Sequence, residues 1–134
     1  MTTLETLIKL DHESRQFGFD WPNQDAILDQ VIDECREIRE DIQGCAAPHK
    51  IQEEIGDLLH AAISLCIFSG FDVNDTLAKV NIKFERRMTL LKKLAKERGL
   101  KNLDGKTTEF ILGLWSEIKV METTQIKNRA DQLS

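Results

Sequence analysis

Apolar residues recur at intervals of three and four along most of this 134-residue chain, which is the spacing of one face of an α-helix. The pattern is clearest in the segment that follows Pro48. One face of that segment carries Ile51, Ile55, Leu58, Leu59, Ala62, Ile63 and Cys66. No segment alternates apolar and polar residues as a half-buried strand does. The sequence therefore predicts an all-α fold.

Glycine and proline divide the chain into helical segments. The predicted helices cover residues 3–16, 24–43, 48–69, 72–99 and 110–118. The last stretch loses the apolar rhythm and is expected to fray. We predict an antiparallel helical bundle of about five helices, in a single domain over residues 1–120 with a C-terminal tail over residues 121–134.

The composition excludes several other classes of protein. Hydrophobic residues make up 41% and charged residues 31% of the chain, which is typical of one globular domain. The longest apolar run, residues 58–68, is interrupted twice and falls short of the ~20 residues of a membrane span. The N-terminus has no secretory signal pattern, and the three cysteines form no CxxC pair. A cytoplasmic location is predicted.

The charges are unevenly distributed along the sequence. The net charge is −5, but residues 79–101 contain nine basic residues and two acidic ones, so this segment is +7 and the remainder is −12. An anionic ligand gripped by the basic segment, with cations held by the acids, suits this distribution. The alternatives are a solvated helix face and a non-catalytic module that binds nucleic acid or an acidic partner through residues 79–101.

Four carboxylates lie on or beside the apolar stripes of the second and third predicted helices. At about 100° per residue, Glu34 falls within the stripe of its helix, and Glu37 follows on that side. Glu54 and Asp57 flank the stripe of the next helix in the same way. A short turn joins the two helices, so we expect them to be antiparallel neighbours whose acidic pairs meet.

Such a cluster of acids requires a cation, because unneutralised carboxylates repel one another. Oxygen ligands without cysteine or histidine favour Mg²⁺, with Mn²⁺ as a possible substitute. We predict a catalytic metal site formed by Glu34, Glu37, Glu54 and Asp57. The alternative is that these acids lie on the surface and pair with neighbouring cations, namely Arg36, Arg39 and Lys50.

Several short motifs follow one another in a fixed order. They are FGFDWP at 17–22, DExxE at 33–37, EEIGDLL at 53–59, NIKFERR at 81–87 and LWSEIK at 114–119. Their order and spacing resemble the MazG nucleotide pyrophosphohydrolase family, an all-α group, and in particular the C-terminal catalytic domain of two-domain MazG. The resemblance covers about residues 15–119.

The resemblance implies hydrolysis of nucleoside triphosphates, NTP or dNTP, to the monophosphate and pyrophosphate, in the service of nucleotide-pool housecleaning. It implies that Mg²⁺ is held by the two acidic pairs. It assigns substrate binding to Lys50, Asn81, Lys83, Arg87, Trp115 and Lys119. It also implies a homodimer or tetramer in which dimerisation completes the core.

Departures from the family pattern leave the preferred nucleotide open. Asp33, Gln30 and His60 differ from the residues usual at their positions, so a specialised dUTP, dCTP or phosphoribosyl-ATP pyrophosphatase is the alternative enzyme. Two of the substrate contacts also have simpler interpretations. Trp115 has apolar neighbours and can be a core residue, and Lys119 can be a charge near a helix C-terminus.

Overall fold

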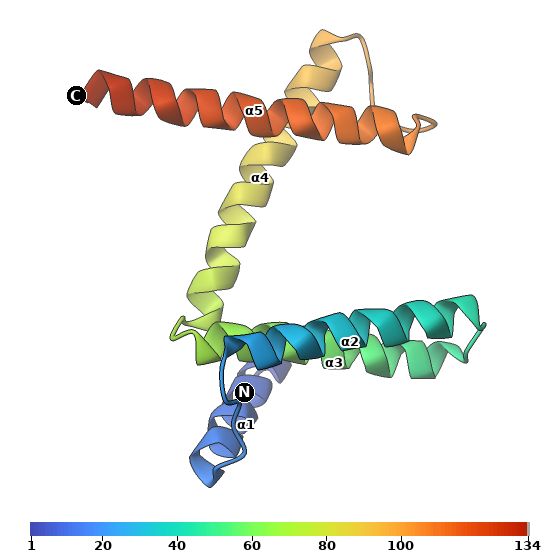
Figure 1. The fold of residues 1–134 in the computed structure, drawn as a ribbon. Coiled ribbons are helices and arrows are strands. Elements are labelled where there is room, and N and C mark those ends of the chain that lie inside the picture. Colours follow the sequence, from blue (N-terminus) through green and yellow to red (C-terminus); the bar gives the residue numbers. More distant parts are fainter. Residues whose placement is uncertain (134) are drawn as a thin grey trace. The chain divides into compact units, whose positions relative to one another are not determined.

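The computed structural model describes residues 1–133 and contains five α-helices with no strand in that range (Figure 1). The helices are α1 (Thr3–Phe17), α2 (Gln24–Gln43), α3 (Pro48–Phe68), α4 (Val73–Glu97) and α5 (Thr108–Leu133). The all-α prediction is confirmed. The first four helices begin and end close to the predicted positions, because each is bounded by the glycine, proline or capping residues that the sequence shows.

The chain forms two compact units that divide within α4. The N-terminal unit, Met1–Leu77, contains α1, α2, α3 and the start of α4. The C-terminal unit begins at Ala78 and contains the rest of α4 and α5. The single domain over residues 1–120 stays a prediction.

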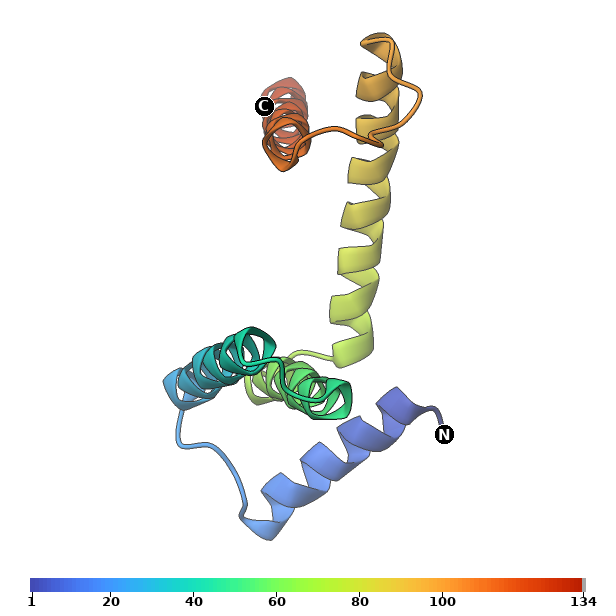
Figure 2. The same ribbon diagram turned by 90° about the vertical axis from the view of Figure 1, so that its right-hand side faces the viewer.

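In the N-terminal unit, α2 and α3 lie side by side as an antiparallel pair (Figures 1 and 2), as predicted, and α1 packs against α3. The turn between α2 and α3 is tight, with Cys45 at a φ of 56°. Pro48 stands in the first turn of α3, where a missing N–H costs no helical hydrogen bond. Ile27 and Ala61 are buried in this unit.

The segment between α1 and α2 leaves α1 at a sharp angle. Gly18 caps α1 with a φ of 103°, which residues with a side chain rarely adopt. Asn23 then starts α2, and its side chain accepts a hydrogen bond from the backbone N–H of Ala26. The intervening residues, including Asp20 and Trp21, are thereby held between two fixed helix ends.

In the C-terminal unit, the core lies where α5 crosses α4. Leu91, Leu114 and Ile118 are buried there, and partly buried Met88 and Trp115 pack against them. The prediction of a short helix over 110–118 followed by a frayed tail was wrong about local structure, because α5 continues to Leu133. Between residues 121 and 133 the buried residue is a carboxylate, Glu122, so apolar spacing does not reveal this part of the helix.

No single helix in residues 1–133 is long and apolar enough to cross a membrane. The adjacent helices α3 and α4 reach the length and apolar composition of a membrane span only when they are taken together across the bend between them. The predicted cytoplasmic location stays a prediction.

Candidate functional site

Glu34 is a buried acid with incomplete hydrogen bonding. Its side chain lies on α2, in the apolar stripe as predicted, and the residue is 8% exposed. Oε1 accepts a 2.7 Å hydrogen bond from Nε2 of Gln30. Oε2 is buried and has no partner. A buried carboxylate oxygen without a donor is costly, so this atom is suited to a cation or to a ligand's hydrogen-bond donor.

Glu54 on α3 faces a second acid, Asp41, which lies near the end of α2. Neither Oε2 of Glu54 nor Oδ2 of Asp41 has a hydrogen-bond partner when both groups are ionised. The hydrogen bond that the pair makes on protonation, together with burial and repulsion by Asp41 and Glu37, raises the pKa of Glu54 to about 7, although Lys50 acts to lower it. A bound cation would stabilise the ionised pair instead.

Asp41 was missed by the sequence analysis. It stands four residues after Glu37 and seven after Glu34, so all three acids fall on one side of α2. Nζ of Lys50 lies 3.6 Å from Oδ1 of Asp41. The spacing along α2 was the signal that could have identified Asp41, since it extends the predicted acidic pair by one turn.

The other two predicted metal ligands, Glu37 and Asp57, are exposed. Within residues 1–133, no group of three or more histidine, cysteine or acidic side chains is arranged closely enough to hold a metal ion. The unpartnered oxygens of Glu34 and Glu54 and the oxygen-only donor set fit a hard divalent cation. The four-carboxylate metal site therefore stays a prediction, and the oxygen atoms of its residues are of the kind that binds Mg²⁺.

A pocket of about 340 Å³ opens beside these acids in the N-terminal unit. Glu34 and Asp57 line it, so two predicted metal ligands border the cavity. Other lining residues come from α1 and from the segment after it, including Asp11 and Trp21. No role was predicted for this pocket from the sequence, although the FGFDWP motif supplies part of its wall.

In the C-terminal unit, Arg87 is held by a buried acid. Nε of Arg87 donates to Oε1 of Glu122 at 2.6 Å, and Nε of Arg86 donates to Oε2 at the same distance. Burial raises the pKa of Glu122, but the hydrogen bonds and charges of the two arginines outweigh it and hold the pKa below its ordinary value. Glu122 is a residue that the sequence analysis missed because it placed this position in an irregular tail.

Trp115 lies next to the same arginine. The guanidinium carbon of Arg87 is 5.7 Å from the centre of the Trp115 ring, and the ring of Phe84 is 6.2 Å away. Trp115 also packs against the core of its unit, as the simpler sequence interpretation proposed. Asn81, Lys83 and Lys119 are exposed on the helices of this unit. Of the predicted substrate contacts, Lys50 lies in the N-terminal unit together with the four carboxylates, and the others lie in the C-terminal unit.

The MazG nucleotide pyrophosphohydrolase domain family matches residues 23–91. The chain belongs to this family. The matched segment contains the four predicted metal ligands together with Lys50, Asn81, Lys83 and Arg87. It excludes α1, the Trp21 segment and all of α5.

Curated relatives extend the MazG match over more of the chain. A nucleoside triphosphate pyrophosphohydrolase of Escherichia coli K12 is 32% identical over 115 residues, which are 85% of this chain and 43% of that protein. A nucleoside triphosphate pyrophosphohydrolase/pyrophosphatase MazG of Thermotoga maritima is 28% identical over 92 residues, 69% of this chain and 34% of that protein. The chain thus spans less than half the length of these relatives.

Proposed function

We propose that this MazG protein hydrolyses nucleoside triphosphates, NTP or dNTP, to the monophosphate and pyrophosphate in a Mg²⁺-dependent reaction. The observation that carries the proposal is the pair of buried, unpartnered carboxylate oxygens on Glu34 and Glu54, inside the segment that matches the pyrophosphohydrolase domain. The names of the E. coli and T. maritima relatives support the reaction class. The cellular role we propose is housecleaning of the nucleotide pool in the cytoplasm.

Mg²⁺, or Mn²⁺ in its place, would be held by Glu34, Glu37, Glu54 and Asp57, with Asp41 beside Glu54 as an additional neighbour. When bound, such an ion supplies charge that polarises phosphate oxygens and makes a water more acidic. The ionised form of Glu54 is favoured under those conditions, because the cation offsets the repulsion from Asp41. The carboxylate of Glu34 or Glu37 accepts the proton of the attacking water.

The basic residues contact the triphosphate. Arg87 commits Nε to Glu122, which leaves its two terminal amino groups for phosphate oxygens. Lys50, Lys83 and Lys119 supply further positive charge, and Asn81 supports the same contacts. Gripping the β- and γ-phosphates as the leaving group exposes the α-phosphorus to water, so the α–β bond breaks and pyrophosphate departs.

A homodimer, or a tetramer built from two dimers, is part of the proposal. Large apolar side chains remain exposed on the α2–α3 pair, including Ile32 at 64% and Leu59 at 60%. Burial of such side chains against a second copy would remove apolar surface from water and complete the core. Sedimentation at micromolar concentration tests this, and a folded, active monomer would contradict it.

The activity is tested by a panel of NTPs and dNTPs with Mg²⁺, followed by product identification in ¹⁸O-labelled water. We expect nucleoside monophosphate and pyrophosphate, with the label only in the monophosphate. A marked preference for dUTP, dCTP or phosphoribosyl-ATP within the panel would identify a specialised enzyme. Nucleoside diphosphate and orthophosphate as primary products would contradict the proposal, as would activity that survives EDTA.

A further inference from the structure

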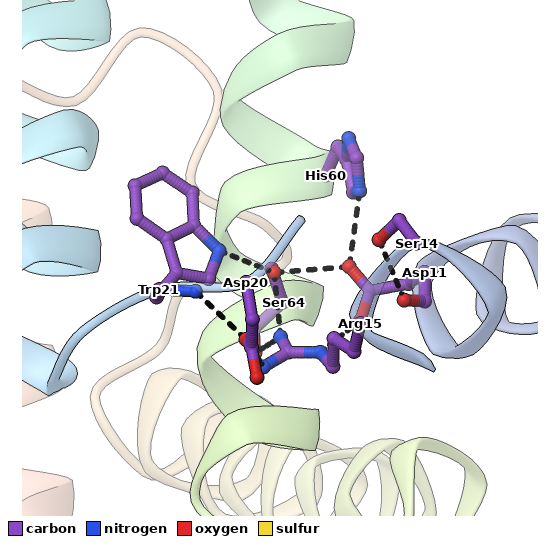
Figure 3. A network of polar contacts seen from close by, with 7 residues as sticks. All are labelled: Asp11, Ser14, Arg15, Asp20, Trp21, His60 and Ser64. Atoms are coloured by element: carbon purple, nitrogen blue, oxygen red, sulfur yellow. Dashed lines mark hydrogen bonds and ion pairs between the residues drawn. The ribbon is translucent and has the colours of Figure 1, made fainter. Parts of the chain in front are cut away.

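The pocket beside Glu34 and Asp57 has a wall built by one hydrogen-bond network (Figure 3). Ser64 of α3 is at its centre. The Ser64 hydroxyl donates to Oδ1 of Asp11 at 3.0 Å and accepts from Nη2 of Arg15 at 2.8 Å and from Nε1 of Trp21 at 3.1 Å. One hydroxyl group therefore ties α1, α3 and the segment after α1 together, and all of its hydrogen-bonding capacity is used.

Trp21 is fixed from two sides. Its indole N–H donates to Ser64, and its backbone N–H donates to Oδ1 of Asp20 at 2.7 Å. The same Asp20 oxygen accepts from Nη1 of Arg15 at 2.8 Å, while Nε of Arg15 donates to Asp11 at 2.8 Å. A ring held by this many contacts is a preorganised surface for stacking, because little motion is lost when a flat ligand lies against it.

The network uses most of the pocket's hydrogen-bond donors and leaves acceptors. Burial raises the pKa of Asp11, but hydrogen bonds from Arg15 and Ser64 outweigh it and hold the pKa below the ordinary value, so this carboxylate is ionised and only accepts. Nε2 of His60 lies 3.3 Å from Oδ1 of the same carboxylate. Gln30 donates to Glu34 and keeps its amide oxygen as an acceptor.

We propose that this pocket, hereafter the Trp21 pocket, receives the nucleobase of the substrate, and that it prefers bases carrying an exocyclic amino group. The proposal rests on the proposed function, and it names the substrate class for that site. A volume of about 340 Å³ lies within the usual range of small-molecule sites. Carboxylates of Asp11, Asp20, Glu34 and Asp57 line the pocket, so a neutral amino-bearing ring suits it and a phosphate does not.

The inference goes beyond the MazG match, because the matched segment begins at residue 23. Asp11, Arg15 and Trp21 all precede it. It also assigns the base to a different tryptophan from the sequence analysis, which gave a substrate contact to Trp115 in the C-terminal unit. The two assignments predict that a nucleoside without phosphates perturbs different tryptophans, Trp21 in one case and Trp115 in the other.

The two tryptophans of the chain make the test direct. Each gives one indole N–H signal in a ¹⁵N–¹H NMR spectrum, and a Trp21→Phe variant identifies which is which. Cytidine and uridine are titrated separately, since they differ in the amino or oxo group at one ring position. We expect cytidine to shift the Trp21 signal, not the Trp115 signal, with about tenfold higher affinity than uridine. A shift confined to Trp115, no shift at all, or equal affinities would overturn the proposal.

Variants provide the second measurement. Trp21→Ala should weaken cytidine binding at least fivefold through lost stacking, whereas Trp21→Phe keeps a ring and should retain most of the affinity. Ser64→Ala should also weaken it, and Ser116→Ala, an exposed serine on α5, is the matched control. Circular dichroism and thermal melting establish that each variant is folded. Unchanged cytidine affinity in folded Trp21→Ala protein would refute the assignment.

Failure of the proposed function is distinguishable from failure of this inference. Pyrophosphate with Mg²⁺ probes the carboxylates and basic residues without a base. Cytidine binding at Trp21 without binding of Mg²⁺ and pyrophosphate would support the pocket assignment and contradict the proposed reaction. The opposite result would leave the reaction standing and overturn the Trp21 pocket.

Discussion

Glu122 in the C-terminal unit and Glu34 and Glu54 in the N-terminal unit differ in how their buried oxygens are hydrogen-bonded. In the C-terminal unit, both oxygens of Glu122 accept 2.6 Å hydrogen bonds, one from Arg86 and one from Arg87. In the N-terminal unit, Glu34 and Glu54 each keep a buried oxygen with no partner. An acid paired in this way is satisfied by the fold itself, whereas an unpaired one lowers stability unless a ligand arrives. The contrast separates an acid that positions other groups from acids that have an oxygen left for the proposed cation.

The largest expected effect is on turnover. Glu34→Gln and Glu54→Gln should each reduce kcat by about 10²–10⁴-fold, the usual range for loss of a positioned acid or base. Their unfolding free energies should not fall, because each variant replaces a carboxylate that has a buried oxygen without a hydrogen-bond partner. Urea unfolding and initial rates measure the two properties. Glu53→Gln is the control, since Glu53 is exposed and adjacent to Glu54. Near-normal turnover in both variants would contradict the site assignment.

Glu122→Gln should behave in the opposite way and reduce stability. Removal of the negative charge leaves Arg86 and Arg87 without their shared partner, at a cost of about 1–3 kcal/mol in unfolding free energy. Urea unfolding measures this cost. Glu117→Gln offers a comparison, because Glu117 pairs with Arg98 at the surface of the same unit, where water and salt screen the pair and it contributes little to stability. Equal losses in the two variants would contradict the contrast drawn between buried and exposed pairs.

Mg²⁺ should stabilise the protein by a smaller amount that depends on its concentration. At ten times the dissociation constant, linkage predicts about 1.4 kcal/mol, which is read as an increase in Tm. The increase should be absent in the double variant Glu34→Gln/Glu54→Gln and present in Glu122→Gln, each compared with its own Tm in the absence of Mg²⁺. A metal-dependent shift that survives in the double variant would place the cation elsewhere.

The smallest effect concerns pH and Asp11. The pKa of Asp11 in the folded protein lies below its ordinary value of 3.8. Its contribution to stability is therefore fully present above 3.8 and is lost as the pH falls through the lower folded value. Asp11→Asn should cost about 1 kcal/mol at pH 7, and the difference from the unsubstituted protein should shrink in acid. Asp29→Asn, at an exposed site, should show neither change.

Most of the helical framework could be predicted from local sequence, and so could the burial of Glu34. Helix boundaries depend on nearby residues, such as Gly18 and Pro48, and apolar spacing places Glu34 on the inner face. The end of α5 was mispredicted because apolar rhythm detects burial of apolar side chains only. Glu122 is buried by its two arginines, and nothing in its immediate neighbours indicates this.

The Trp21 pocket could not be predicted for a different reason. Asp11 and Ser64 are 53 residues apart, and Trp21 and Ser64 are 43 apart. Hydrogen bonds over such separations depend on how α1 packs on α3, and a single sequence carries no signal for that pairing. The motif containing Trp21 could be recognised, but the Ser64 that orients its ring could not.

The position of the Trp21 pocket has a consequence for how such enzymes diversify. The carboxylates proposed for chemistry lie on α2 and α3, inside the matched segment, whereas much of the wall proposed to read the base belongs to residues 11–21, before it. Part of the proposed selectivity is then encoded in a stretch of the gene that lies before the proposed hydrolytic residues. If the first twenty-two codons were replaced by those of a homologue, we expect the base preference to change while the proposed hydrolytic residues stay the same. This requires a hydroxyl at position 64, which forms hydrogen bonds with the replaced segment.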